Sequence, residues 1–116
     1  MTVETRITIY LGQDQNLAIT VTDSAGAAQA QTGWATEFVL RRDLYGAADL
    51  TLTSAGGAIA YSNGEGTDDV GTVSIADTDT LNLPSGEYHW SYRRTDAGSE
   101  VPMAHGIADL QLLSAR

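Results

Sequence analysis

Short runs in which apolar and polar residues strictly alternate are the feature that most constrains the fold of this chain. Residues 7–11 carry isoleucine or leucine at every second position, and residues 17–21 carry leucine, isoleucine and valine in the same way. A period of two places successive side chains on opposite faces of a strand, whereas an amphipathic helix needs apolar residues three and four positions apart. Both runs are therefore predicted to be β-strands with one buried face.

The same pattern recurs along the chain and predicts an all-β fold. Further strands are predicted at residues 34–41, 50–53, 58–61, 72–76 and 87–95, with turn-forming residues between them. About eight short strands at this spacing are typical of an antiparallel β-sandwich of two sheets. The pair Gly56 and Gly57 accepts the positive φ of a tight turn, so residues 50–53 and 58–61 are predicted to form a hairpin.

The C-terminal segment, residues 103–114, fits two assignments. Met103, Ile107 and Leu110 have helical spacing, whereas Ala108, Leu110 and Leu112 alternate as in a strand. The strand is favoured, because Gly106 weakens a short helix by about 1 kcal/mol relative to alanine and because an all-β fold needs a closing strand.

The segment between Leu83 and Tyr88 has the spacing of a tyrosine corner. In this feature, a tyrosine near the start of a strand donates its hydroxyl to the backbone a few residues upstream and holds the chain where it crosses between sheets. Gly86, two residues before Tyr88, would let the chain turn. The motif concerns the fold and says nothing about activity.

Composition bounds the size and chemistry of the protein. The 116 residues contain 15 acidic and 6 basic side chains, giving a net charge of −9, and 42% of them are hydrophobic. We predict one domain over residues 1–116, with residues 1–5 as a candidate N-terminal arm. All basic residues are arginine and cysteine is absent, which excludes Schiff-base lysines, thiolate nucleophiles, disulfides and thiolate metal sites.

Charge and hydropathy also exclude classes of partner. A domain with this negative charge would be repelled by a phosphate backbone, so nucleic-acid binding is not expected. No run approaches the roughly 18 apolar residues of a membrane span, and the N-terminus lacks the basic and apolar regions of a signal peptide. Synthesis in the cytoplasm is therefore expected, with no membrane partner.

Three segments, taken in order, resemble a known family. They are residues 11–26, which begin Leu-Gly-Gln-Asp; residues 32–39, Thr-Gly-Trp-Ala-Thr-Glu-Phe-Val; and residues 71–92, which end Gly-Glu-Tyr-His-Trp-Ser-Tyr. Together they resemble the small immunoglobulin-like β-sandwich of tailed-bacteriophage structural proteins, a family that includes the N-terminal domain of the lactococcal phage upper baseplate protein. Gln13 departs from the charged residue that is common at its position. The resemblance implies a virion component, made in the host cytoplasm, that docks on other virion proteins.

Metal binding and catalysis have weak candidates only. Glu65, Asp68 and Asp69 could supply oxygen ligands to calcium, but their spacing does not match a calcium loop, so a solvated acidic loop is preferred and no cofactor is expected. A hydrolase would have to use His89 or His105 as its base. His89 lies on the predicted outer face of its strand, where a surface or contact role is preferred.

The two arginine doublets are ambiguous, because adjacent strand residues point to opposite faces. The doublets are Arg41–Arg42 and Arg93–Arg94. In one interpretation, a rim arginine of each doublet lays its stem over the core and pairs with a local carboxylate such as Asp43 or Asp96. In the other, they donate to carboxylates of a partner protein. Candidate partner contacts, chosen because tyrosine and arginine are enriched at interfaces, are Tyr10, Arg41, Tyr45 and Arg93.

The aromatic residues Trp34, Trp90, Tyr88 and Tyr92 share the phase of the apolar core positions. They are predicted to be structural, although the same residues on an exposed face would make a platform for sugar rings.

The function expected from the sequence is therefore a non-enzymatic virion structural protein. A compact module suits repeated attachment to a lattice, so a capsid cement or decoration protein is preferred, docked on the major capsid protein as a symmetric homo-oligomer. A tail, neck or baseplate accessory protein is the first alternative, with tail or baseplate proteins as partners. A carbohydrate-binding or adhesion module is the second.

Overall fold

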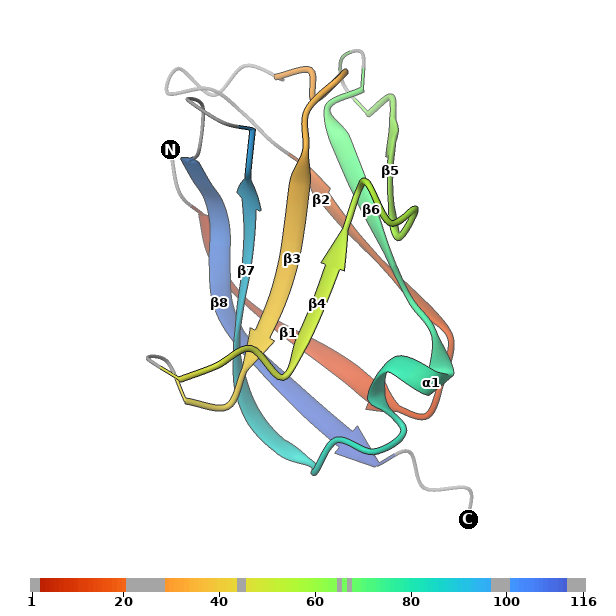
Figure 1. Ribbon diagram of the computed structural model, residues 1–116, viewed down its shortest axis with the longest axis vertical. Helices are drawn as coiled ribbons and strands as arrows, with labels where there is room; N and C mark the ends of the chain where they lie inside the picture. Colours follow the sequence, from red (N-terminus) through yellow and green to blue (C-terminus); the bar gives the residue numbers. More distant parts are fainter. Residues whose placement is uncertain are drawn as a thin grey trace.

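Two β-sheets packed face to face form the protein, as the predicted all-β sandwich requires (Figure 1). The computed structural model describes residues 3–20, 29–43, 46–64, 66, 68–96 and 101–112. One sheet has five strands in the order β1-β8-β7-β3-β4, and the other has three in the order β2-β6-β5. The elements are β1 (Val3–Leu11), β2 (Gln15–Thr20), β3 (Thr36–Arg41), β4 (Leu50–Thr53), β5 (Ile59–Ser62), β6 (Val70–Ile75), α1 (Asp77–Thr80), β7 (Gly86–Arg94) and β8 (Val101–Leu112).

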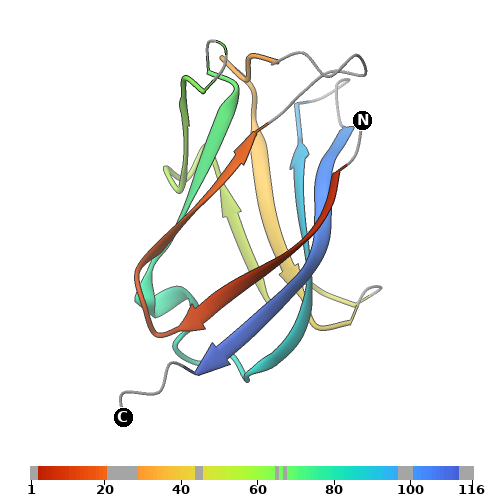
Figure 2. The same ribbon diagram turned by 180° about the vertical axis from the view of Figure 1, so that it is seen from behind.

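The first and last strands lie side by side in parallel (Figure 2). The register runs from Val3 opposite Ala104 to Leu11 opposite Leu112, and this is the one pair of described strands that departs from the antiparallel arrangement expected. Residues 3–5 belong to β1, so they do not form the N-terminal arm considered from the sequence. The C-terminal segment is a strand as favoured, because β8 is held on both sides by β1 and β7.

The predicted hairpin between residues 50–53 and 58–61 is wrong. β4 pairs with β3 in the five-stranded sheet, whereas β5 pairs with β6 in the three-stranded sheet. A tight turn is present between them: the N–H of Gly57 donates to the carbonyl of Ser54 at 3.1 Å, and Gly57 has a φ of 86°. The turn carries the chain from one sheet to the other. Each of the two short strands then pairs with a longer strand of its own sheet, β4 with β3 and β5 with β6.

The core lies between the two sheets and contains the predicted inward faces. Phe38 on β3 and Trp90 on β7 stack with ring centroids 6.0 Å apart. The buried apolar side chains of this core are Ile9, Ile19, Phe38, Leu40, Ile59, Val73, Ile75, Tyr88, Trp90, Tyr92, Ala104, Ala108 and Leu110. Alternation on β3, β6 and β7 thus predicted the core correctly, because each strand has one buried face.

The tyrosine corner is confirmed. The hydroxyl of Tyr88 donates to the carbonyl of Pro84 at 2.8 Å, and the Tyr88 ring is buried. Gly86 has a φ of 139°, a conformation that residues with a Cβ rarely adopt. The corner therefore joins the short helix α1 and its loop to the start of β7.

Replacing Tyr88 with phenylalanine is expected to lower the free energy of unfolding by about 1 kcal/mol, because the ring still fills the core while the bond to Pro84 is lost. Urea unfolding followed by far-UV circular dichroism measures the difference. Tyr10→Phe is the matched control, since Tyr10 is exposed. An unchanged midpoint for Tyr88→Phe would contradict the assigned role of this hydroxyl.

Candidate functional site

A pocket of about 160 Å³ opens on the outer face of the five-stranded sheet. We call it the outer-face pocket. Its lining combines a guanidinium, two imidazoles and a hydroxyl group, and the residues that line it are Arg41 from β3, His89, Trp90 and Ser91 from β7, and His105 and Gly106 from β8.

Strand register explains why these side chains meet. Arg41 lies directly opposite His89 across the β3–β7 pair, and Ser91 lies opposite His105 across the β7–β8 pair. His89 and His105 are therefore diagonal neighbours on adjacent strands, a position from which long side chains reach one another. Each of the four alternates with the core residues of its strand, so all four face outward.

The centre of this outer face carries an apolar side chain that is shielded from solvent. Val39 has the outward phase on β3 and lies opposite Ser91, yet its exposed fraction is only 2%. Neighbouring side chains must therefore shield it from solvent. The polar groups of the outer-face pocket stand beside an apolar surface, which strengthens electrostatic interactions there relative to open water.

Most charges around the pocket are already paired. The Nε atom of Arg93 donates to the Glu37 carboxylate at 2.9 Å. Arg6 donates to Asp109 at 2.7 Å and to Glu87 at 2.9 Å, and the hydrogen bond to Asp109, with that to Glu87, raises the pKa of Arg6. Within the described part of the chain, these three carboxylates are held by arginines outside the outer-face pocket.

Arg41 differs from these arginines. Its Nε atom donates to the carbonyl oxygen of Gly46 at 3.2 Å, and its side chain is half-buried. Of the ion pairs found among the described residues, none involves Arg41. One carbonyl uses one of the five N–H donors of a guanidinium, so Arg41 has donors to offer to a ligand.

The other predicted contact residues are dispersed. Tyr10 is exposed on β1, as expected, with 38% of its surface accessible. Arg93 is exposed but pairs with Glu37, which fits a structural role on the sheet surface. Tyr45 lies outside the described residues. The structure therefore places Arg41 in a pocket and leaves Tyr10 and Arg93 apart from it.

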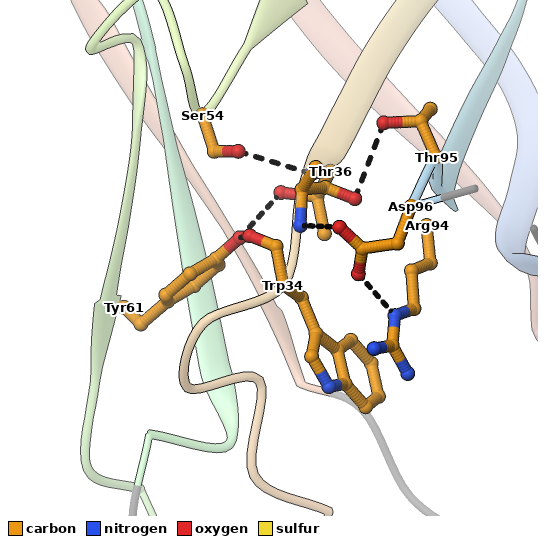
Figure 3. A network of polar contacts seen from close by, with 8 residues as sticks. Trp34, Thr36, Ser54, Tyr61, Arg94, Thr95 and Asp96 are labelled. Carbon is orange, nitrogen blue, oxygen red and sulfur yellow. Dashed lines mark hydrogen bonds and ion pairs between the residues drawn. The ribbon is translucent and has the colours of Figure 1, made fainter. Parts of the chain in front are cut away.

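The second arginine doublet contains a structural residue, as one interpretation of the sequence held (Figure 3). The Nε atom of Arg94 donates to the Asp96 carboxylate at 2.5 Å, and its guanidinium carbon lies 4.3 Å from the centroid of the Trp34 ring. Asp96 also accepts the backbone N–H of Ala35 at 2.9 Å. The hydrogen bonds from Arg94 and from Ala35 lower the pKa of the Asp96 carboxyl group.

Trp34 belongs to the same cluster of contacts (Figure 3). Its carbonyl accepts the hydroxyl of Tyr61 at 2.7 Å, and Tyr61 is also 2.8 Å from the hydroxyl of Thr36. These bonds join the three-stranded sheet to the start of β3. Trp34 is half-buried, whereas Trp90 is only 3% exposed in the core.

The acidic loop residues stabilise the loop itself. Asp69 is buried, and its carboxylate accepts the N–H of Gly64 at 2.6 Å. The carboxylate of Asp68 accepts the hydroxyl of Thr32 at 2.7 Å. Glu65 lies outside the described residues. Among the residues that are described, no group of three His, Asp or Glu side chains is placed to hold a metal ion.

A buried polar network escaped the sequence analysis. Gln31 is completely buried. Its Oε1 atom accepts the hydroxyl of Tyr92 at 2.6 Å, and its Nε2 atom donates to the carbonyl of Asp69 at 3.0 Å. A single buried glutamine in a loop has no periodicity that could reveal it. The network closes the end of the core between β6 and β7.

Stability is expected to fall in alkaline solution because of Tyr92. Burial raises the pKa of Tyr92 to about 12, whereas a tyrosine in the unfolded chain titrates near 10. Between these values the unfolded chain binds fewer protons than the folded one, so the stabilisation is complete below about pH 10 and falls as pH rises toward 12. Urea unfolding should show a loss of about 1 kcal/mol between about pH 10 and pH 11.

Tyr92→Phe is the control for this effect. The variant should show a smaller loss over the same range, because the group that titrates has been removed. An identical pH dependence in both proteins would assign the loss to other groups.

Comparisons with known proteins add little. No protein-family model and no curated protein matches the chain. Among solved structures, the chain is similar to a nucleoside hydrolase-related hypothetical protein from Saccharophagus degradans that is associated with carbohydrate metabolism, at 14% identity and a TM-score of 0.28. The match covers 94% of this chain and 22% of that protein, so the chain spans about a fifth of its length. A likeness this weak does not inform on function.

In the part of the chain that the structure describes, no helix is long and apolar enough to cross a membrane.

Proposed function

We propose that the protein is a bacteriophage virion structural protein that docks on other virion proteins and performs no catalysis. The observation that supports this best is the exposure of two large apolar side chains at the end of the sandwich where β1 ends. Tyr10 and Leu81 lie there with exposed fractions of 38% and 64%, and both are large apolar side chains. Exposed residues of this kind are typical contacts between proteins.

The surroundings of Leu81 also fit a protein contact. An open groove of about 270 Å³ runs beside it, lined by Leu11, Gly12, Leu81, Leu83 and Ser85. The helix α1 holds Leu81 in place, because the Thr80 hydroxyl accepts the N–H of Gly12 at 2.9 Å. The apolar end is therefore an ordered surface on which a partner side chain could pack.

Two further observations weigh against other functions. Asp68 and Asp69, which were considered as calcium ligands, accept hydrogen bonds from Thr32 and Gly64. The aromatic residues of β7 are buried, so they do not form the sugar-binding platform that a carbohydrate module would need.

Within the virion we propose the capsid surface as the site of attachment, as a cement or decoration protein. The test is the copy number of this protein in purified phage particles, measured by quantitative mass spectrometry against the major capsid protein. A number comparable to that of the capsid protein is expected. A far smaller copy number would indicate a location at the neck, tail or baseplate. Complete absence from the particles would overturn the virion role.

Leu81→Ser is expected to weaken attachment to particles by roughly tenfold while leaving the free energy of unfolding within about 0.5 kcal/mol. The reason is that Leu81 has most of its surface in solvent before docking and loses it on docking. Sedimentation of the labelled protein with particles that lack it measures the affinity. Thr51→Ser, a change at an exposed residue of the edge strand β4 that does not line this groove, is the matched control. Equal binding by both variants would remove this end from the interface.

A further inference from the structure

β2 is an edge strand without a charged residue. In the part of the chain that the structure describes, the edges are β1 and β4 in one sheet and β2 and β5 in the other. β4 and β5 are four residues long, and β1 carries Glu4 and Arg6. Short strands and charged residues are the usual protection of an edge against pairing with another chain. β2, with the six residues Gln-Asn-Leu-Ala-Ile-Thr, has neither, so it is the edge best suited to accept a further strand.

One side of β2 presents backbone groups to a further strand. β2 pairs with β6, from Gln15 opposite Ile75 to Thr20 opposite Val70, and among the described strands it has no second neighbour. In an antiparallel pair, the N–H and C=O groups of alternate residues point toward the partner, and those of the residues between them point away. Every second residue of β2 therefore offers a donor and an acceptor at the outer edge of the sheet.

An apolar pocket lies along the same edge, between the two sheets. We call it the seam pocket. Its volume is about 160 Å³, and it is lined by Ile7 from β1, Leu17, Ala18, Ile19 and Thr20 from β2, Trp90 from β7 and Ala104 from β8. β1 and β2 diverge from the turn that joins them (Figure 2). Ile7 and Leu17 are only half-buried although both pack against the core, so the core is incompletely covered between these two strands.

The alternation of β2 determines which side chains of an added strand would reach the seam pocket. Leu17 and Ile19 face the core, whereas Asn16, Ala18 and Thr20 are exposed. Directly opposite residues of paired strands lie on the same face of a sheet, so every second side chain of the added strand would lie next to Leu17 and Ile19. A cavity of about 150 Å³ with an aliphatic and aromatic lining binds a group of the size of benzene. The seam pocket therefore has room for one apolar side chain.

The end of β2 at Gln15 is acidic. Asp14 precedes the strand, and its carboxylate accepts the N–H of Asp77 at 2.7 Å. Asp79 lies with Asp77 in α1, and its carboxylate accepts the N–H of Ala76 at 2.8 Å. The ion pairs found among the described residues involve none of these three aspartates. A basic residue on the added strand, at the end that lies beside Asp14, would complement this charge.

We propose that β2 and the seam pocket bind an extended segment of a docking protein. The segment adds to the three-stranded sheet antiparallel to β2, which is the more stable arrangement per residue. It places apolar side chains next to Leu17 and Ile19 and a basic residue, at its C-terminal end, beside Asp14. A net charge of −9 on each chain disfavours a second copy in this place. The protein that supplies the segment rests on the function proposed above, whereas the chemistry of the segment follows from the edge, the pocket and the charge.

The test uses the peptide acetyl-Thr-Val-Thr-Ile-Thr-Thr-Lys-Lys-amide as the probe. Paired antiparallel to β2, it places its valine opposite Ile19, its isoleucine opposite Leu17 and its lysines beside Asp14. Titration into the ¹⁵N-labelled protein should shift the backbone amide signals of residues 15–20 most and should slow hydrogen exchange at amides of β2. A control peptide with asparagine in place of the valine and the isoleucine should not bind. Unmoved signals, or equal binding of the control peptide, would overturn the proposal.

Two N-methylated peptides test strand pairing itself. One carries the methyl groups on the amides of its first, third and fifth residues, and the other on those of its second, fourth and sixth. An N-methyl group removes a hydrogen-bond donor, and alternate amides of an added strand point toward β2 and away from it. One of the two peptides should therefore bind nearly as well as the parent peptide, and the other should not bind. Loss of binding in both, or in neither, would contradict strand addition.

Leu17→Ala tests the seam pocket. The variant should bind the peptide roughly tenfold more weakly, because it removes part of the apolar wall. Leu83→Ala is the matched control, since Leu83 is also a half-buried leucine packed against the core but lines the groove beside Leu81. Urea unfolding of both variants shows that each is folded under the conditions of the titration. Equal affinities of the two variants would remove the seam pocket from the site.

Asp14→Asn tests the orientation of the segment. Asparagine keeps an acceptor for the N–H of Asp77 and removes the charge, so binding of the peptide should weaken by about threefold at low salt. Asp68→Asn is the matched control, because Asp68 precedes Val70, which lies opposite Thr20 at the other end of β2. An equal effect of both variants, or a larger effect of Asp68→Asn, would overturn the antiparallel orientation.

Sedimentation of the protein without peptide tests the other occupant of this edge. No dimer through β2 is expected. A dimer in which the amides of residues 15–20 are already protected from hydrogen exchange would place a second copy on β2 and overturn the proposal.

The outcome is separable from that of the virion role. Peptide binding by a protein that is absent from particles would retain the segment site and discard virion docking. A protein that is present in particles but does not bind the peptide would retain docking and discard this site.

Discussion

Phe38→Ala is expected to lower the free energy of unfolding by about 3–5 kcal/mol, a large part of the stability of a domain of this size. Phe38 is completely buried on β3, between the two sheets, and its ring stacks on Trp90 at 6.0 Å. Truncation would remove both the buried area and the ring contact, and the rigid strands on either side cannot close the cavity.

Urea unfolding followed by tryptophan fluorescence measures this loss. Trp90 is 3% exposed in the folded protein, so its emission should also move to longer wavelength when water enters the space left by the ring. Leu81→Ala is the control, because Leu81 is exposed and its truncation should change stability by less than about 0.5 kcal/mol. A loss below about 1 kcal/mol for Phe38→Ala would contradict the packing described here.

Gly71→Ala is expected to destabilise the protein by about 3 kcal/mol or more, although it adds a single methyl group. A Cβ at Gly71 would lie 2.2 Å from the hydroxyl of Tyr92 and 3.1 Å from Oε1 of Gln31. The phenol cannot simply move away, because it is buried and donates to Gln31 at 2.6 Å. The new methyl group therefore has to break or displace the polar network that closes this end of the core.

A double variant tests that cause. Tyr92→Phe alone loses one hydrogen bond, but in the Gly71→Ala background it also removes the atom in closest contact with the methyl group. The two losses should therefore be non-additive, with Gly71→Ala/Tyr92→Phe more stable than the sum of the single effects by about 1 kcal/mol or more. Strict additivity in thermal or urea unfolding would show that the cost of Gly71→Ala arises elsewhere.

The candidate site was only partly accessible from the sequence. Alternation placed His89 on an outer face and singled out Arg41 as a residue with two interpretations. It could not bring Arg41, His89 and His105 into one pocket, because that depends on β3, β7 and β8 being neighbours in a stated register. The structural role of Asp69 was also missed, since the sequence shows an acidic run but not which carboxylate turns inward to accept the N–H of Gly64.

The sequence by itself determined what depends on neighbouring residues. Alternation specified which faces of β3, β6 and β7 are buried, and the local Leu83–Tyr88 spacing specified the tyrosine corner, whose hydrogen bond spans four residues. Only the tertiary structure decided which strands pair. The tertiary structure placed β4 and β5 in different sheets, set β1 parallel to β8 and buried Gln31. These outcomes depend on contacts between segments far apart in the chain. The alternation of apolar and polar residues carries no information on such contacts.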